Sequence, residues 1–293
     1  MTTLGEIPTP QANLLVVVYR AAAWQARHLT GRRSVWDVDD GAALQQWARR
    51  TTELAAQRDI AEAQARAVGT PAPWIAAAIQ GGAARSAFDD TTPLPDAVAP
   101  QREVLVAQVQ VEMDQCRHMV SVSQVFARHP GGPAHSPIVA RRAARAAELS
   151  WTRVALLAHA LDLSPRERRS LWGRSANTLW RNAFAAQLSS PEPLLARWRE
   201  LTAPTAVHHR AIAVSYLSAA ELTVEDARAA GHTPPELPVL AQHLTLRAEA
   251  GPAISTAVTA AADPTHTPVW TDTATTPTPP DPGPPARHPE VTT

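Results

Sequence analysis

Arginine is the residue type whose chemistry stands out in this sequence, because it provides all 27 basic residues and no lysine is present. Twelve arginines lie between residues 137 and 210, where only five acidic residues accompany them. A guanidinium group forms forked hydrogen bonds with phosphate oxygens, so this basic region is a candidate phosphate-binding surface. The codon bias of a GC-rich genome nevertheless explains the missing lysine more simply than selection for guanidinium groups does. The candidate nucleic-acid-binding residues are Arg141, Arg142, Arg145, Arg166, Arg168, Arg169 and Arg174.

The distribution of charge is more informative than its sum. A formal net charge of zero argues against a uniformly basic nucleic-acid-binding protein. Residues 101–210, however, contain 15 arginines and 8 acidic residues, whereas residues 211–293 contain 3 arginines and 9 acidic residues. The middle of the chain is therefore basic and the C-terminal part acidic. This asymmetry makes DNA a candidate partner of the basic region.

Signatures of catalysis and of cofactor binding do not appear in the sequence. The single cysteine, Cys116, excludes an internal disulfide and a cysteine-cluster zinc site. The histidines lack the His-Glu-x-x-His spacing of zinc hydrolases, and the glycine pair 81–82 is not followed by the Gly-Lys-Ser/Thr of a phosphate loop. No nucleophile elbow or dinucleotide fingerprint is present. We therefore predict no catalytic residues, no cofactor, no metal site and a protein that is not an enzyme.

The elements that must position the arginines are predicted to be helices. Ala, Leu and Val dominate the apolar residues, and only three Phe and two Tyr are present. This composition favours an all-α, multi-helix bundle over a β-rich fold. The apolar run 14–18 predicts a buried helix over about residues 12–28, although the run alone also suits a short strand. It is too short for a signal peptide or a membrane span, so we expect a cytoplasmic protein without membrane contact.

Proline, glycine and composition divide the chain into predicted parts. We expect residues 1–10 to be a flexible arm and residues 89–100, which are rich in proline, to link two helical parts. Within the first part, a short helix from Pro73 should stop at the glycine pair 81–82. The parts are 11–88, an N-terminal helical subdomain; 101–250, a central and C-terminal helical domain containing the basic region 137–210; and 251–293, a disordered tail rich in Pro and Thr.

Residues 102–128 form the most regular apolar pattern. Apolar and small residues from Val106 through Cys116 and Val120 recur at alternating spacings of three and four, which predicts one stripe of a helix. The alternation over residues 109–113 would also suit a strand. On the helix, Cys116 should be a small buried hydrophobe and not a nucleophile. The same stripe is the candidate surface for a protein partner or for self-association.

The basic region contains strong signals for helix starts. Ser136 precedes Pro137, and the stripe that follows predicts one helix of about 25 residues, with a break at Ser150 as the alternative. Ser164 and Glu167 have the spacing of a capping box. Four tryptophans lie among the arginines, and we expect them to be core anchors in preference to base-stacking platforms. They are Trp151, Trp172, Trp180 and Trp198.

The segment LAHALDLSPRERRSLW, residues 157–172, resembles a helix-turn-helix within the broader stretch 154–172. Ala158 has the small size that lets two helices cross, and Asp162 stands where glycine is usual. Arg168 departs from the pattern, which has an apolar residue there. The resemblance implies that Arg166, Arg168, Arg169 and Arg174 face phosphates or base edges. Ordinary solvated arginines at a helical corner are the alternative.

Across about residues 40–200, the order of helices resembles uncharacterised all-helical proteins encoded on actinobacterial mobile elements. That resemblance implies no known activity. Two functions follow from the sequence. One is a nucleic-acid-associated accessory or regulatory protein that uses the arginines. The other is a non-enzymatic helical scaffold that binds protein through its apolar stripes.

Overall fold

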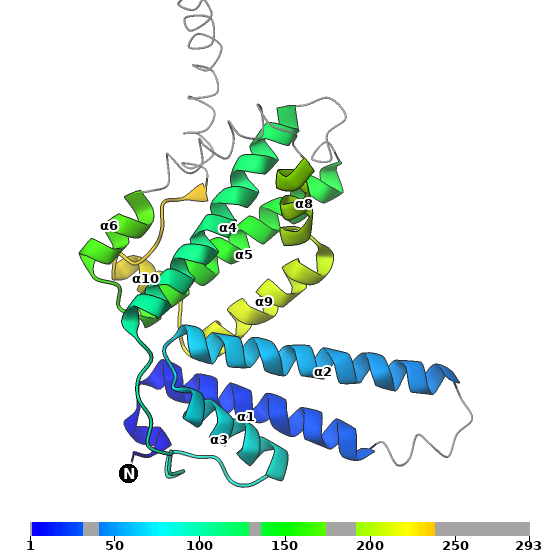
Figure 1. Cartoon of the computed structure of the whole chain (residues 1–293), viewed down its shortest axis with the longest axis vertical. Helices are drawn as coiled ribbons and strands as arrows, with labels where there is room; N and C mark the ends of the chain where they lie inside the picture. Colours follow the sequence, from blue (N-terminus) through cyan, green and yellow to red (C-terminus); the bar gives the residue numbers. More distant parts are fainter. Residues whose placement is uncertain (1, 32–40, 129–135, 174–191, 238–293) are drawn as a thin grey trace, which may run out of the picture. The chain divides into compact units, whose positions relative to one another are not determined.

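The computed structural model describes residues 2–31, 41–128, 136–173 and 192–237 (Figure 1). Over these residues it contains helices and no β-strand, apart from one isolated bridge between Thr3 and Pro93, which confirms the predicted all-α, multi-helix bundle. The predicted tail lies outside the described residues. The helices are η1 (Leu4–Glu6), α1 (Thr9–Thr30), α2 (Gly41–Ala67), α3 (Ala72–Ala84), α4 (Arg102–Arg128), α5 (Pro137–Ala160), α6 (Pro165–Gly173), α8 (Glu192–Leu201), α9 (Pro204–Ala219) and α10 (Val224–Ala229).

The apolar run near the N-terminus forms part of α1, a helix of 22 residues that packs against α2 and α3. Leu14, Leu15 and Val18 are fully buried, as expected for a run that is apolar on most sides. The alternative of a short strand is therefore excluded. Among the described helices, none is both long enough and apolar enough to cross a membrane.

Helix α3 continues through the glycine pair at which the sequence predicted its end. It runs to Ala84 and ends with Arg85 in the left-handed conformation, at φ 57°. Gly82 is buried where α3 meets α1, and a Cβ built there would lie 2.3 Å from the carbonyl oxygen of Tyr19. The prediction of a stop was wrong because close packing of the two backbones offsets the low helix propensity of glycine.

Residues 2–10 are held against the protein and do not form a flexible arm. Leu4 is buried, and its backbone N–H donates to the carbonyl of Thr92 at 3.0 Å. The backbone N–H of Leu94, also buried, donates to the carbonyl of Thr2 at 2.8 Å. The prediction of a loose arm was wrong because the backbone N–H and C=O groups of residues 2–5 form hydrogen bonds with those of residues 90–94, far away in sequence.

The proline-rich segment 89–100 does not separate two domains. This segment and the described residues on either side of it belong to one compact unit. Trp74 fixes it from α3 by donating its Nε1–H to the carbonyl of Pro95 at 2.8 Å. Helices α1 and α2 also pack on α9, which joins the two predicted helical parts into one core.

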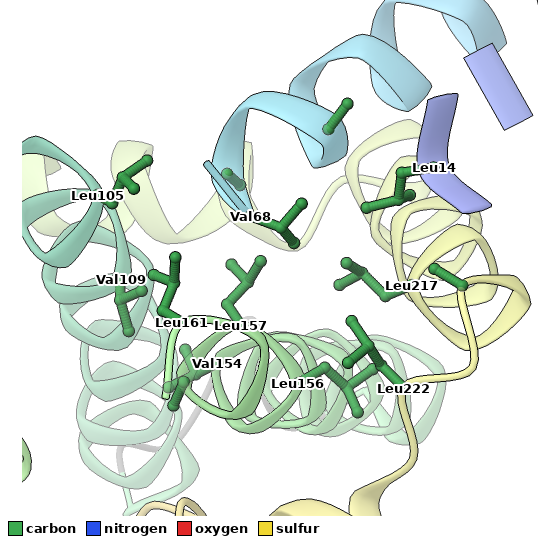
Figure 2. Packing of buried hydrophobic residues seen from close by; sticks show 14 of the residues in the cluster. Leu14, Val68, Leu105, Val109, Val154, Leu156, Leu157, Leu161, Leu217 and Leu222 are labelled. Carbon is green, nitrogen blue, oxygen red and sulfur yellow. The ribbon is translucent and has the colours of Figure 1, made fainter. Parts of the chain in front are cut away.

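That core lies where α1, α2, α4, α5 and α9 converge. Figure 2 shows Leu14 and Val68 facing Leu157, Leu161 and Leu217 across it. All five side chains belong to one buried cluster. Apolar burial of this extent is the main stabilising term of the fold, at roughly 25 cal/mol per Å² of apolar area.

Helices α4 and α5 are antiparallel and lie side by side (Figure 1). The start of α4 bonds to the end of α5, and Cys116, near the middle of α4, bonds to Ala147. Val109, Met113 and Cys116 have no exposed surface, and Val120 is also buried. The predicted helical stripe is confirmed and the strand alternative excluded. Because the protein's own helices cover this stripe, it is not available as a docking surface.

Helix α5 is continuous through Ser150. This residue is buried, and its hydroxyl donates to a carboxylate oxygen of Glu112 on α4 at 3.3 Å. The prediction of one long helix is confirmed, and the alternative break is excluded. Ser150 resembles a cap in sequence, but its hydroxyl bonds across to a neighbouring helix instead.

Cys116 is expected to be chemically inert in the folded protein. Its thiol is fully buried and donates to the carbonyl of Ala147 at 3.5 Å, and burial, aided by the charge of Glu112, raises its pKa to about 12. At about pH 8 it should not react with a disulfide reagent until denaturant is added, whereupon one thiol should titrate. Rapid reaction of the native protein would contradict this burial.

Candidate nucleic-acid interface

The helix-turn-helix-like segment forms a sharp corner between α5 and α6. Asp162 adopts the left-handed conformation at φ 44°, the conformation that glycine usually supplies at such a turn. The N–H of Leu163 donates to the carbonyl of Ala158 at 3.1 Å, and the N–H of Asp162 donates to that of His159 at 3.0 Å. These two bonds form a Schellman motif, which ends α5 and turns the chain into α6.

The first turn of α6 is closed by the predicted capping box. The N–H of Ser164 donates to Glu167 Oε2 at 2.8 Å, and the N–H of Glu167 donates to Ser164 Oγ at 3.3 Å. Glu167 also accepts two bonds from the guanidinium of Arg102, at 2.8 and 2.9 Å. Chiefly because of Arg102, the pKa of Glu167 is lowered to about 2. The carboxylate therefore remains charged and holds α6 to α4.

Arg102 joins three parts of the corner, which the sequence did not indicate. Besides Glu167, it donates to the carbonyls of Leu161 and Asp162, each at 3.0 Å. These carbonyls lie in the turn, where α5 leaves backbone acceptors without helical partners. The contact joins residues about 60 positions apart, and no local spacing rule detects such a pair.

The side of α6 that faces the rest of the protein, here called its inner side, is held by contacts from α4 and from the segment after α10. Leu171 is buried, and its carbonyl accepts a hydrogen bond from Arg117, a fully buried residue of α4. Arg168 donates through Nη1 to the carbonyls of Ala230 and Gly231, just beyond α10. Arg168 thus has a structural role on the side of α6 that faces α10, which explains the arginine at a position where the helix-turn-helix pattern has an apolar residue.

The opposite side of α6, here called its outer side, is exposed. It carries the other two arginines of this helix. Arg166 and Arg169 are exposed and lie three residues apart, so they share one helical face. Neither forms an ion pair with a described acidic residue. Ser170 is exposed on the same face. Arg174, the next predicted binding residue, lies outside the described residues.

The arginines of α5 form a separate group. Arg141 and Arg145 are exposed and Arg142 is half-buried, but Arg145 pairs with Glu148 at 2.7 Å. Arg145 precedes the end of α5 by 15 residues, or about 22 Å along the helix axis. The structure therefore does not bring the predicted binding residues into one cluster. It places Arg166 and Arg169 together at the corner and leaves the α5 group at the other end of that helix.

Two of the four tryptophans are core residues, as predicted. Trp151 and Trp198 are buried, and their Nε1–H groups donate to the carbonyl of Pro235 at 3.0 Å and to Ser123 Oγ at 2.9 Å. Trp172, on α6, is half-buried. Trp180 lies outside the described residues. Among the three tryptophans of this group that the structure describes, Trp172 alone combines partial exposure with a place beside the arginines of the corner.

A histidine pair lies beneath the corner. Nδ1 of His232 is 3.3 Å from Nδ1 of His159, and Nε2 of His232 is 3.4 Å from Asp162 Oδ1. Despite this grouping, the described residues contain no set of three or more His, Cys, Asp or Glu side chains placed to hold a metal ion. His232 is only 5% exposed, so the pair belongs to the packing between α5 and the segment after α10.

His232 should make the protein less stable in mild acid. Burial first, and then the charges of Arg168 and His159, lower the pKa of His232 below its ordinary 6.5, while Asp162 opposes the shift. The unfolded chain therefore takes up a proton at a higher pH than the folded one. The contribution of neutral His232 to the free energy of unfolding is fully present above pH 6.5. It is lost as the pH falls through the lower pKa of His232 in the folded protein.

Urea unfolding between about pH 7 and pH 5 checks this expectation. His232→Gln should lose less of its unfolding free energy across that interval than the unaltered protein does. His208→Gln, a change at an exposed histidine, should behave like the unaltered protein. Equal pH dependence of all three proteins would contradict the role assigned to His232.

Comparisons of the chain with protein-family models, with curated proteins and with solved structures give no match.

Proposed function

We propose that the protein is a nucleic-acid-associated accessory or regulatory protein, and that the outer side of α6 contacts phosphates. The observation that carries this proposal is the pair Arg166 and Arg169, which are exposed on one face of α6 without an ion-pair partner among the described residues. Guanidinium groups held on a rigid element bind phosphate with little loss of order.

The corner supplies that rigidity. The Schellman turn at Asp162, the capping box of Ser164 and Glu167, and the bonds from Arg102 fix the first turn of α6. Arg168 and Arg117 fix the side turned away from Arg166. A second helix that follows a tight turn and presents its outer face is the arrangement by which helix-turn-helix proteins contact DNA.

The alternative function, a scaffold that binds protein through its apolar stripe, has less support. Val109, Met113 and Cys116 of that stripe are fully buried within the protein. Two other valines of α4, Val104 and Val111, are about half exposed, but single exposed apolar side chains are common on protein surfaces. Arg166 and Arg169, which have no ion-pair partner among the described residues, therefore favour nucleic acid.

The proposal is tested by fluorescence anisotropy with labelled duplex and single-stranded DNA over a series of salt concentrations. The logarithm of the affinity should fall linearly with the logarithm of the salt concentration. The double variant Arg166→Ala/Arg169→Ala should bind about tenfold more weakly and reduce the salt slope by about 2, since each phosphate contact contributes about 1.

The matched control is Arg20→Ala/Arg27→Ala, which removes two exposed arginines from α1 and so makes the same change in net charge. This control should retain the affinity and the slope of the unaltered protein. Absence of binding to either form of DNA at low salt, or equal losses in the two double variants, would overturn the proposal.

A further inference from the structure

An open cavity of about 520 Å³ lies between the inner edge of α6 and the segment that follows α10. Its volume is within the range of roughly 300–1,000 Å³ that is typical of small-molecule sites. The cavity adjoins the outer face of α6 and shares Arg169 with it, whereas Arg166 does not line the cavity. The lining residues are Pro165, Arg168, Arg169, Trp172, Gly173, Gly231 and Thr233.

The spacing of residues along α6 builds one wall of this cavity. Arg168 and Arg169 precede Trp172 by four and three residues, so the three side chains are neighbours on the helix surface. The indole of Trp172 is half-buried and packs against the main core cluster, which restricts its motion. This wall therefore presents the indole plane of Trp172 beside the guanidinium groups of Arg168 and Arg169.

The opposite wall depends on Gly231, which has a φ of 68°. A Cβ at this position would lie 2.8 Å from Nη1 of Arg168, so only glycine lets that guanidinium approach the backbone. Arg168 donates to the carbonyls of Ala230 and Gly231 through Nη1. Its guanidinium is thereby held at the boundary between the two walls. Thr233 adds a hydroxyl group to the lining.

The cavity is positively charged. Its described lining residues include two guanidinium groups and no acidic side chain, and Arg169 makes no hydrogen bond or ion pair with a described residue. A second cavity, of about 430 Å³ beside the start of α9, differs in this respect. There Glu200 pairs with Arg197 at 2.7 Å, and Arg210 donates to the carbonyl of Leu201 at 2.6 Å. Of these two cavities, the α6 cavity is the one whose described lining combines guanidinium groups without an acidic neighbour and an aromatic plane.

We propose that the α6 cavity binds one unpaired nucleotide unit, with its base stacked on Trp172 and its phosphate on Arg168 and Arg169. Stacking on an aromatic side chain accepts any base, and guanidinium groups match phosphate. A base inside a duplex is stacked and paired, so the ligand is either a free nucleotide or an unpaired position of a strand. This inference rests on the proposed function, nucleic-acid binding. It adds that the protein binds single strands more tightly than duplexes.

The test uses the full-length protein with three probes: adenosine monophosphate by titration calorimetry, and by anisotropy a single strand of about 12 nucleotides and its duplex. The single strand should bind about tenfold more tightly than the duplex. Adenosine monophosphate should bind detectably, and inorganic phosphate much more weakly because it lacks the base.

Matched variants separate the cavity from the outer face of α6. Arg169→Ala and Trp172→Leu should each weaken the binding of adenosine monophosphate about tenfold, and Trp172→Phe, which keeps an aromatic plane, should restore most of it. Arg166→Ala changes an exposed arginine outside the cavity and should leave that titration unchanged. Far-ultraviolet circular dichroism verifies that each variant is folded.

The possible results distinguish the two proposals. Salt-dependent binding of both DNA forms with equal affinity, and no titration by adenosine monophosphate, would overturn the cavity inference and leave the outer interface standing. Binding of adenosine monophosphate without binding of either DNA form would support the cavity as a site for a free nucleotide and overturn the proposed function. Binding of adenosine monophosphate that Arg169→Ala and Trp172→Leu leave unchanged would overturn the inference.

Discussion

Replacing Gly82 by alanine is expected to lower the free energy of unfolding by about 3 kcal/mol, since the added methyl group has no room. It would lie 2.3 Å from the carbonyl oxygen of Tyr19 and 2.9 Å from Cβ of Ala22. The first of these atoms belongs to the backbone of α1, so a side-chain rotation cannot relieve the overlap. Helices α1 and α3 must move apart, and the packing of the core between them is lost.

Gly81→Ala is the matched control, one residue earlier in the same helix. A Cβ at Gly81 meets only ordinary contacts, the nearest being Ser86 Oγ at 3.4 Å. Alanine is favoured over glycine in a helix by about 1 kcal/mol, so this variant should be neutral or slightly stabilised. Urea unfolding followed by circular dichroism measures both variants. Equal midpoints for Gly81→Ala and Gly82→Ala would disprove the assigned crossing of α1 and α3.

Replacing Glu112 by alanine is expected to cost about 3–5 kcal/mol of unfolding free energy, as for other buried ion pairs that lose one partner. Glu112 is only 8% exposed and accepts hydrogen bonds from Arg153 and from Ser150 on α5. Arg153 donates in turn to Gln64 of α2 at 2.9 Å. Loss of the carboxylate leaves the largely buried guanidinium of Arg153, 18% exposed, without its counter-charge, which is the main source of the cost.

Glu148→Ala is the control for this second substitution. It removes the same type of side chain from the Arg145–Glu148 pair, in which both residues are more than half exposed. Exposed pairs of this kind contribute at most about 1 kcal/mol, so its effect should be small. Glu112→Gln should lie between the two, because its amide still accepts a hydrogen bond. If Glu112→Ala and Glu148→Ala had similar urea midpoints, Glu112 would not be an essential buried charge.

The helices of this protein were largely predictable because their signals are local. The capping box of Ser164 and Glu167 spans three residues, and the apolar stripe of α4 repeats within each turn. The same periodicity correctly placed Cys116 in the core. These features depend on residues a few positions apart, and neighbouring residues in sequence remain neighbours in any helix.

The candidate site was predicted only in part, because the roles of its arginines depend on distant contacts. Arg166, Arg168 and Arg169 lie within four consecutive positions and have the same side chain, so the sequence does not distinguish their roles. Arg168 nevertheless bonds to carbonyls more than 60 residues away, while Arg166 and Arg169 are exposed and only Arg169 of these two lines the cavity. The cavity of α6 likewise needs Gly231 and Thr233, which no motif connects with Trp172.

The sequence by itself therefore determined the all-α class, most helix starts and the basic character of the region that forms the α5–α6 corner. Tertiary structure alone decided that α3 continues through Gly81 and Gly82, that residues 2–10 are held in place, and that the basic residues divide into two groups. The physical reason is the range of the interactions. Caps and helical stripes act within one or two turns, whereas backbone crossings, buried charges and cavities arise only when segments distant in sequence meet.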